Sequence, residues 1–479
     1  MRLIVSGFSL LLFTLASPII SLAEEKSDVS SVCPSDLPTA ITEIINRPEF
    51  ERSRWGIEIQ TLEEGKSLFS LNGNMFFTPA SSLKLLTSAA SLIELGTDYR
   101  IETTIYSTGT KPNLTSLRLE GQGDPTISTE TLKNIVHQLQ SRGIKRIENL
   151  IIDNSYFAPP SINPTWEWLD VHSYFATAVN STILNQNTVT LTLLPQQIGQ
   201  PVKYYWSDTI AARQWQLDNQ AVTGNKDIDY NIELDSYLGK PKLQLRGELA
   251  VNEPPDVWDL AVVDPAQYFL ESFRSQLTDV GITVGRGTVI NQPEQNQGET
   301  ELMTIYSPPM QQILEEVNQE SNNLYAEVLG KILAKKLGLE TATEAVKSSL
   351  NTIGINPNEY VLADVSGLSR QNLISPQILV KTLQIMSQLS QRESYQQSLS
   401  LASINGTLKN RFRNSSITGN LWGKTGTLTG VGTLSGYIID RQNPSIVFSI
   451  LVNNSELKSN EIRQAIDEII VILNQLNKC

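Results

Sequence analysis

Three short polar motifs, widely spaced along 479 residues, constrain the fold of this chain more than any other feature. They are Ser81-Ser82-Leu83-Lys84, Ser321-Asn322-Asn323 and Lys424-Thr425-Gly426. The two motif serines are 240 residues apart, whereas only 103 residues separate Ser321 from Lys424. A helical subdomain that joins two walls of one cleft needs far fewer than 240 residues. We therefore expect a domain that is interrupted, between the first and second motifs, by an insert of domain size.

The first motif contains the residues that an activated serine nucleophile needs. A serine hydroxyl is a poor nucleophile until a base takes its proton, and a residue three positions later on a helix lies on the same face. Lys84 can therefore reach Ser81. Because an ammonium group cannot act as a base, the pKa of Lys84 must be lowered by burial or by a second cation, for which Lys424 is the obvious candidate. Without the two lysines, an N-cap serine would explain Ser81 equally well.

The three motifs differ in specificity. A second S-x-x-K occurs at Ser455–Lys458, in a polar stretch before a predicted terminal helix. S-x-N also occurs by chance at Ser70, Ser161 and Ser403. K-T-G occurs once and precedes a predicted strand pair, Thr427 to Ile439 and Ile446 to Val452.

The residues after Ser81 predict a buried helix that ends at Gly96. The N-terminus of such a helix carries unpaired N–H groups and the positive end of the helix dipole. Negative charge that develops on a substrate oxygen can be stabilised there. The sequence therefore predicts a helix that presents a nucleophile.

Further motifs extend the pattern over most of the chain. They are Gly121-Gln122-Gly123-Asp124-Pro125-Thr126, Trp166-Glu167-Trp168-Leu169-Asp170, Ser321 to Glu327, Ser366-Gly367-Leu368-Ser369-Arg370 and Gly406-Thr407-Leu408. On these residues the chain resembles the D-alanyl-D-alanine carboxypeptidase/endopeptidases, the class C low-molecular-mass penicillin-binding proteins of peptidase family S13. The resemblance implies an α/β (α+β) fold. Its serine β-lactamase/DD-peptidase-like catalytic domain, an antiparallel sheet flanked by helices with a helical subdomain, is interrupted by a large, mostly β insert.

The expected domain organisation follows from the spacing and the resemblance. Strand-like stretches inside the long gap include Ile101–Tyr106 and Val189–Leu193. We predict a signal peptide at 1–23, a split catalytic domain at 24–105 and 300–479, and an insert at 106–299 with a nested subdomain at about 196–250.

The resemblance also implies roles for the motif residues. Ser81 is the expected nucleophile and Lys84 its base, while Ser321 relays protons and Asn323 hydrogen-bonds the substrate amide. Lys424 and Thr425 are expected to hold a terminal carboxylate. The backbone N–H groups of Ser81 and Thr427 are expected to form the oxyanion hole.

Three more residues are candidates for substrate specificity. In the resembling family, an acidic residue after a W-x-W element reads the amine end of a diaminopimelate side chain, which here implies Asp170. Phe175 then forms an apolar wall, and Arg370 lines the same pocket. A helix or turn cap is the alternative interpretation of Asp170.

The activity implied by the resemblance is hydrolysis of peptidoglycan stem peptides by a serine DD-carboxypeptidase and DD-endopeptidase through an acyl-enzyme, which β-lactams also form. One alternative is a β-lactamase or esterase on the same catalytic platform. Another is a catalytically silent peptidoglycan-binding protein. Rapid or slow deacylation of penicillin separates the first alternative from the peptidase.

Composition narrows the remaining possibilities. The net charge of −13 and the pI near 4.9 do not favour nucleic acid as a partner. The only histidines are His137 and His172, and only two cysteines are present, so we expect neither a Ser-His-Asp triad nor a metal site, and no cofactor.

The N-terminal residues predict export to the periplasm or cell envelope. An apolar stretch after Arg2 ends in Ser21-Leu22-Ala23, which is typical of a signal peptide cleaved after Ala23; an uncleaved anchor is the alternative. No later segment is apolar enough to span a membrane, and the apolar stripe from Ile462 to Leu476 predicts a core helix rather than a membrane-coating one. The neighbouring first and last helices of the resembling family imply a Cys33–Cys479 disulfide, and two unpaired thiols are the alternative.

Overall fold

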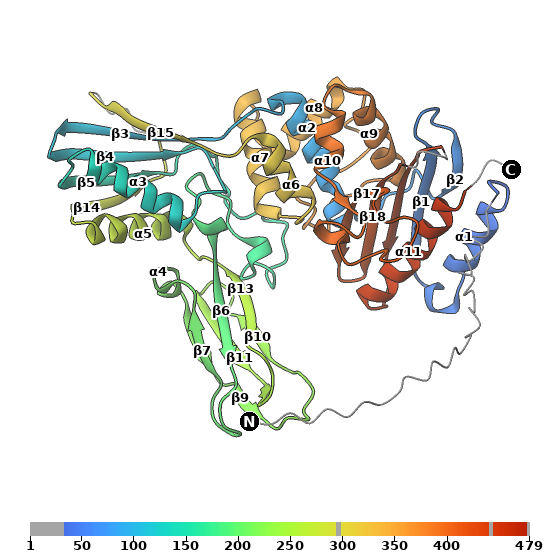
Figure 1. Cartoon of the computed structure of the whole chain (residues 1–479), viewed down its shortest axis with the longest axis horizontal. Coiled ribbons are helices and arrows are strands. Elements are labelled where there is room, and N and C mark those ends of the chain that lie inside the picture. Colours follow the sequence, from blue (N-terminus) through green and yellow to red (C-terminus); the bar gives the residue numbers. More distant parts are fainter. Residues whose placement is uncertain (1–32, 294–297, 440–443, 477–479) are drawn as a thin grey trace, which may run out of the picture.

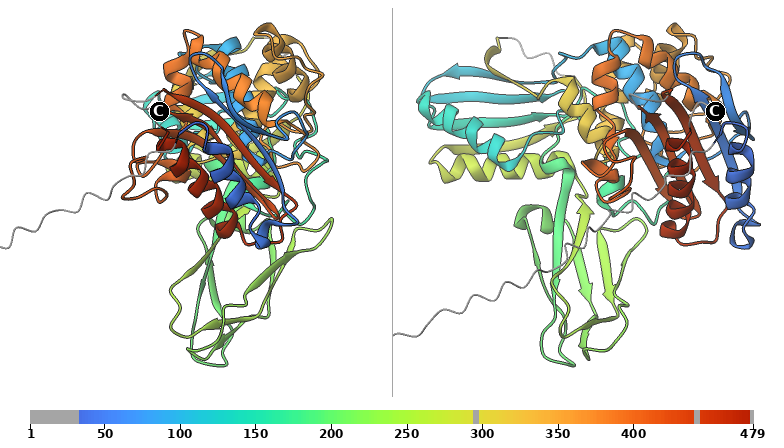
Figure 2. Two further views of the ribbon diagram at one scale, coloured as in Figure 1. Left: turned by 90° about the vertical axis from the view of Figure 1, so that its right-hand side faces the viewer. Right: turned by 45° about the vertical axis from the view of Figure 1, so that its right-hand side comes forward.

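The computed structural model describes residues 33–293, 298–439 and 444–476, so the predicted signal peptide at 1–23 lies outside the described residues. Figure 1 shows three bodies: one built from both ends of the chain, a sheet with two helices at the opposite end, and a narrow β-rich arm. Figure 2 shows that the arm projects away from the other two. The first body contains all three motifs.

A six-stranded sheet forms the centre of the first body, in the order β16-β17-β18-β19-β1-β2. Its strands are β1 (Arg54–Thr61), β2 (Ser67–Leu71), β16 (Ser400–Leu401), β17 (Leu421–Leu428), β18 (Val431–Ile438) and β19 (Ile446–Asn453). β1 pairs antiparallel with β19, with Ile57 opposite Ile450. Every residue of β18 and β19 is buried, as expected of strands covered by helices on both faces.

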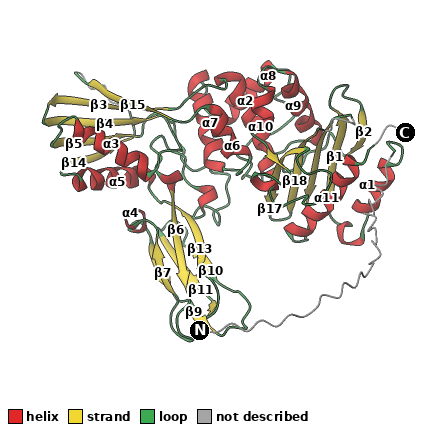
Figure 3. Ribbon diagram, viewed as in Figure 1, coloured by secondary structure: helices red, strands yellow, loops and turns green. Residues whose placement is uncertain are grey.

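Helices from both chain ends cover one face of this sheet, and a helical subdomain covers the other (Figure 3). The first layer consists of α1 (Leu37–Ile45) and α11 (Ser459–Asn474), with the short η1 (Pro48–Phe50) nearby. The second contains α2 (Lys84–Leu95), α6 (Met310–Asn318), α7 (Asn323–Leu337), α8 (Ala342–Thr352), α9 (Pro376–Gln388) and α10 (Arg392–Gln397). The serine β-lactamase/DD-peptidase-like arrangement of an antiparallel sheet, flanking helices and a helical subdomain is thus confirmed.

Two predicted elements are confirmed and one needs correction. α2 ends where Gly96 takes φ +80°, and α11 buries its apolar stripe in the core. The strand predicted from Thr427 to Ile439 is wrong as a single element. β17 ends at Leu428 and β18 begins at Val431, because the chain reverses at Gly430 with φ +72°. The Lys424-Thr425-Gly426 motif therefore lies in β17, on the hairpin strand before the one predicted.

The second body is a five-stranded sheet, in the order β14-β5-β4-β3-β15, with two helices on one face. Its elements are β3 (Glu102–Thr110), β4 (Asn113–Gly121), α3 (Thr129–Ser141), β5 (Arg146–Asp153), α5 (Pro265–Asp279), β14 (Thr283–Ile290) and β15 (Thr300–Tyr306). Leu117 and Leu119 of β4 belong to the core that α3 and α5 complete. The predicted boundary of the insert after residue 105 falls inside β3. The boundary before residue 300 assigns β15 to the catalytic domain, although β15 is the antiparallel partner of β3.

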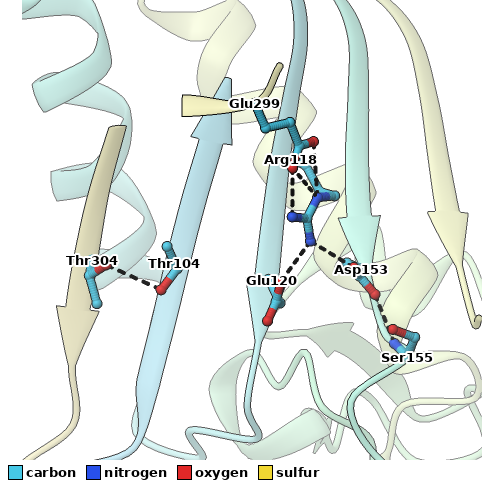
Figure 4. A network of polar contacts seen from close by, with 7 residues as sticks. All are labelled: Thr104, Arg118, Glu120, Asp153, Ser155, Glu299 and Thr304. Carbon is cyan, nitrogen blue, oxygen red and sulfur yellow. Dashed lines mark hydrogen bonds and ion pairs between the residues drawn. The ribbon is translucent and has the colours of Figure 1, made fainter. Parts of the chain in front are cut away.

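Arg118 joins strands on the other face of this sheet (Figure 4). Its guanidinium donates to Glu299 at 2.7 Å, to Glu120 at 2.7 Å and to Asp153 at 2.8 Å. Arg118 alternates along β4 with the leucines that face the helices, so its side chain points away from them. The network connects β4, β5 and the residue before β15.

The arm is built from short strands. They are β6 (Thr188–Leu194), β7 (Lys203–Trp206), β8 (Gln216–Asn219), β9 (Val222–Gly224), β10 (Glu233–Ser236), β11 (Lys242–Arg246), β12 (Glu248–Ala250) and β13 (Asp256–Ala261), with η4 (Asn185–Asn187) and α4 (Thr209–Ala212) beside them. They form the sheets β13-β6-β7, β10-β11-β8 and β12-β9. The buried leucines of the arm continue the core of the second body.

Reduction is expected to lower the melting temperature of the oxidised protein. Cys33 is disulfide-bonded, and its predicted partner Cys479 lies outside the described residues. A link between these positions closes nearly the whole chain, which in the chain-entropy model stabilises the fold by up to about 5 kcal/mol. Intact mass before and after alkylation, with melting curves in both redox states, checks this. Two alkylatable thiols in the oxidised protein would contradict the predicted pair.

Candidate active site

Ser81 lies in a tight turn that is wedged between a helix and a sheet strand. The turn is η2 (Ala80–Leu83), directly before α2, and Ala80 adopts φ +47°. Gly426 of β17 packs against this turn so closely that a Cβ atom there would lie 2.9 Å from the Ser81 nitrogen. Only glycine allows the strand to approach Ser81 in this way.

Lys84 is fully buried at the first position of α2 and donates three hydrogen bonds. Its Nζ lies 2.9 Å from Ser81 Oγ, 2.6 Å from Asn323 Oδ1 and 2.6 Å from the carbonyl oxygen of Ser366. Burial lowers the pKa of Lys84 to about 7, and the charges of Asp364 and Glu327 oppose that shift. Near neutral pH this amine can therefore exist in the neutral form that accepts a proton.

Ser321 and Lys424 form a second serine–lysine pair. Ser321 precedes α7 with φ +62°, and Lys424 Nζ donates to its Oγ at 2.8 Å. Burial and the charge of Lys84 lower the pKa of Lys424. Burial is therefore the largest cause of the lowered pKa in both lysines, and the repulsion between them is an added cause for Lys424.

A cleft of about 750 Å³ runs past these groups. Its lining includes the predicted residues Ser81, Asp170, Phe175, Ser321, Asn323, Arg370, Thr425 and Thr427. Lys84 and Lys424 are buried behind this lining. The structure therefore brings all ten predicted site residues to one cleft and its wall.

Asp170, Phe175 and Arg370 all line the cleft. Arg370 Nε lies 3.1 Å from Glu167 Oε1, and its Nη1 donates to the Thr429 carbonyl at 3.0 Å. Burial and the charge of Glu167 raise the pKa of Asp170, while Arg370 opposes that shift. The backbone of Asp170 also forms a turn, so the residue is both a turn former and part of the cleft lining.

Three contacts at the site were not predicted from the sequence. The Ser366 carbonyl accepts from Lys84, and the carbonyl of Phe175, in η3 (Tyr174–Ala176), accepts from Asn323 Nδ2 at 2.8 Å. Backbone acceptors leave no residue-type signal. Thr407, in η5 (Gly406–Leu408), accepts from Thr425 Oγ1 at 2.8 Å. The sequence contains its Gly-Thr-Leu motif, but the motif alone did not indicate a role for Thr407.

The contact between Lys84 Nζ and Ser81 Oγ suits serine acyl transfer. Among the described residues, no group of three or more histidine, cysteine or acidic side chains is placed to hold a metal ion. In the part of the chain that the structure covers, none of the helices has the length and apolarity needed to cross a bilayer.

Comparisons with known proteins agree with this geometry. The D-Ala-D-Ala carboxypeptidase 3 (S13) family matches residues 37–473. A D-alanyl-D-alanine carboxypeptidase of Actinomadura sp. strain R39 is 29% identical over 89% of this chain and 82% of its own. A penicillin-sensitive carboxypeptidase A of Dictyostelium discoideum is 28% identical over 98% of this chain and 97% of its own.

A solved structure extends the similarity to the fold. Penicillin binding protein 4 of Haemophilus influenzae superposes with a TM-score of 0.80 at 24% identity, over 93% of this chain and 100% of that one. The family that the motifs resemble is confirmed, since the matched region includes all three motifs and both halves of the split body. The chain belongs to the D-Ala-D-Ala carboxypeptidase 3 (S13) family.

Proposed function

We propose that this protein is a serine-type D-Ala-D-Ala carboxypeptidase and DD-endopeptidase that hydrolyses peptidoglycan stem peptides and is acylated by β-lactams. The observation that carries the proposal is the 2.9 Å contact between the buried Lys84 Nζ and Ser81 Oγ, in a chain of this family. The names of the relatives support the choice of substrate.

In the proposed reaction, neutral Lys84 takes the proton of Ser81 as the hydroxyl attacks the penultimate D-Ala carbonyl. The backbone N–H groups of Ser81 and Thr427 stabilise the oxyanion. Ser321, which accepts a hydrogen bond from Lys424, relays the proton taken up by Lys84 to the leaving amine, so that Lys84 and Ser321 end in their starting protonation states. Lys424 and Thr425 hold the terminal carboxylate. Asn323 orients both Lys84 and the substrate amide, and water then releases the acyl group from Ser81.

We also infer that residues 102–306 form an insert in the catalytic domain. β3 and β15, at its two ends, pair with each other. The flanking residues are hydrogen-bonded as well, because Ser307 N donates to the Ile101 carbonyl at 2.9 Å and Ile101 N donates to Ser307 Oγ at 2.8 Å. Adjacent ends are what domain insertion requires. With the predicted signal peptide, this architecture fits an exported, periplasmic enzyme.

Fluorescent penicillin provides the test. The purified protein is incubated with the probe, samples are denatured over a time course, and release of D-Ala from a pentapeptide is measured in parallel. A stable covalent band together with D-Ala release is expected. Rapid loss of the band, without peptide hydrolysis, would instead support a β-lactamase or esterase, and absence of both signals would support a silent binding protein.

Asp170→Asn is expected to lower kcat/KM for a diaminopimelate-containing pentapeptide roughly 10-fold, or about 1.4 kcal/mol. A carboxylate in the cleft lining attracts the ammonium group of that side chain, whereas a penicillin without such a group gains nothing from it. Penicillin acylation should therefore stay within about twofold of wild type. Steady-state kinetics on both substrates measure the difference.

Glu130→Gln is the matched control for Asp170→Asn, because Glu130 is an exposed carboxylate on α3. It should leave both reactions unchanged. Equal losses on the pentapeptide and on penicillin in Asp170→Asn would assign Asp170 a structural role. No loss on either substrate would contradict a role in recognition.

A further inference from the structure

Glu327 is a buried carboxylate one helical turn after the catalytic-site residue Asn323 on α7. It is only 6% exposed, and its Oε1 accepts from the backbone N–H groups of Val365 at 3.0 Å and Ser366 at 2.9 Å. Positions four residues apart share one helix face. Helix α7 therefore acts on Lys84 in two ways. Asn323 contacts Lys84 directly, and Glu327 binds the backbone of Val365 and Ser366, which in turn contacts Lys84.

The segment from Asp364 to Gly367 contacts both Lys84 and the turn that carries Ser81. The Ser366 carbonyl accepts from Lys84 Nζ at 2.6 Å. A Cβ atom on Gly367, which has φ +88°, would lie 2.0 Å from the Ala80 carbonyl oxygen, so this backbone packs directly on the turn that carries Ser81. A shift of the segment would therefore move both the carbonyl that accepts from Lys84 and the backbone that packs on the Ser81 turn.

Asp364 and Thr87 hold the same segment in ways that differ from Glu327. Asp364 accepts from the N–H groups of Gly367 at 2.8 Å and Ser369 at 2.6 Å, which fixes the turn internally. Thr87 of α2 donates its hydroxyl to the Val365 carbonyl at 2.6 Å. Thr87 thus anchors the segment without charge, whereas Glu327 anchors it with a carboxylate.

The charges around Glu327 are few and mixed. Burial and the charge of Asp364 raise its pKa. Lys331, one turn further along α7, donates to the carbonyls of Ala158 and Pro160, and its own pKa is lowered by burial. On Lys84 the negative charges of Asp364 and Glu327 act in the same direction, raising a pKa that burial lowers. Lys424 is another charged neighbour, since the charge of Lys84 lowers the pKa of Lys424.

We propose that Glu327 is a positioning residue for acylation: it holds the Asp364–Gly367 segment against Lys84 and the Ser81 turn, and its negative charge favours the ammonium form of Lys84. This inference rests on the proposed function. It assigns Glu327 no contact with substrate. Its effect reaches the reaction through the protonation and placement of Lys84.

Glu327→Gln separates the two parts of this role. Glutamine keeps an oxygen that can accept from Val365 and Ser366 but removes the charge. With less negative charge nearby, the pKa of Lys84 falls, so the acid limb of the pH–acylation profile should move to lower pH by roughly 0.5 to 1 unit. The alkaline plateau should be retained. Glu327→Ala, which leaves two buried N–H groups without an acceptor, should lower the plateau roughly 10-fold or more.

Thr87→Val is the matched control, because it removes an uncharged anchor of the same segment. Its plateau should fall while the midpoint of the acid limb stays in place. Acylation is followed with fluorescent penicillin between about pH 5 and 9, and melting curves check that each variant is folded. A Glu327→Gln profile that superimposes on wild type would overturn the proposal, as would an equal midpoint shift in Thr87→Val.

A reciprocal measurement does not depend on the folding of Glu327 variants. Infrared difference spectra report protonation of buried carboxyl groups in the otherwise native protein. Because coupling between two groups is mutual, removing the ammonium with Lys84→Met should shift the titration of the Glu327 carboxyl to higher pH. An unchanged titration would overturn the coupling. If wild type is not acylated at all, the proposed function fails, and the infrared result still decides the electrostatic inference.

Discussion

Ser81→Ala is expected to abolish covalent labelling by penicillin while the protein remains folded. The substitution removes the hydroxyl that Lys84 Nζ contacts at 2.9 Å, so no acyl-enzyme can form at this position. Loss of one hydroxyl at a helix start should cost at most about 1–2 kcal/mol of stability. Denaturing gels with fluorescent penicillin measure labelling, and thermal unfolding measures stability.

Ser455→Ala is the control for this substitution, because Ser455 begins the other S-x-x-K sequence. Its Oγ contacts Ser53 Oγ at 3.0 Å, and Ser455 is not among the residues that line the cleft. Wild-type labelling is expected. Labelling of Ser81→Ala at the wild-type level would reject Ser81 as the nucleophile.

Lys84→Arg is expected to be nearly as damaging as the loss of Ser81. A guanidinium keeps its proton at any pH that the protein tolerates, so it cannot serve as a base, and general-base assistance typically contributes about 10²–10⁴-fold. The replacement must also fit a fully buried site in which one amine donates to three acceptors. The acylation rate constant, measured over a penicillin concentration series, reports the loss.

Lys458→Arg is the matched control, since Lys458 is the exposed lysine of the second S-x-x-K sequence. It should acylate at the wild-type rate. If Lys84→Arg retained more than about a tenth of that rate, another group would have to be the base.

The sequence was sufficient to find the candidate catalytic groups because the chemistry proposed for them restricts the residue types. A serine with a lysine three positions later, a serine two positions before an asparagine, and a K-T-G strand can be found without knowledge of the fold. The spacing also predicted an insert, since 240 residues separate Ser81 from Ser321. The three motifs meet as expected around Lys84 and Lys424.

Features that depend on tertiary contacts could not be predicted in the same way. Glu327 follows apolar positions of a buried helix, and only the fold shows that its carboxylate accepts from the backbone N–H groups of Val365 and Ser366. The Ser366 carbonyl has no residue-type signal at all. The pairing of β3 with β15 joins residues about 200 positions apart, so local patterning could not place both strands in one sheet.

Pairing of β1 with β19 determines when activity can arise during biosynthesis. Ile57 finds its partner Ile450 only after almost the entire chain has been made, whereas the strands of the insert meet earlier. Domains generally fold from the N-terminus as the chain emerges, so the insert can become compact while the catalytic sheet is still incomplete. Lys424, on β17, reaches Ser321 in that same late step. A nascent or truncated chain therefore holds Ser81 without its finished cleft, and the hydrolase is assembled last.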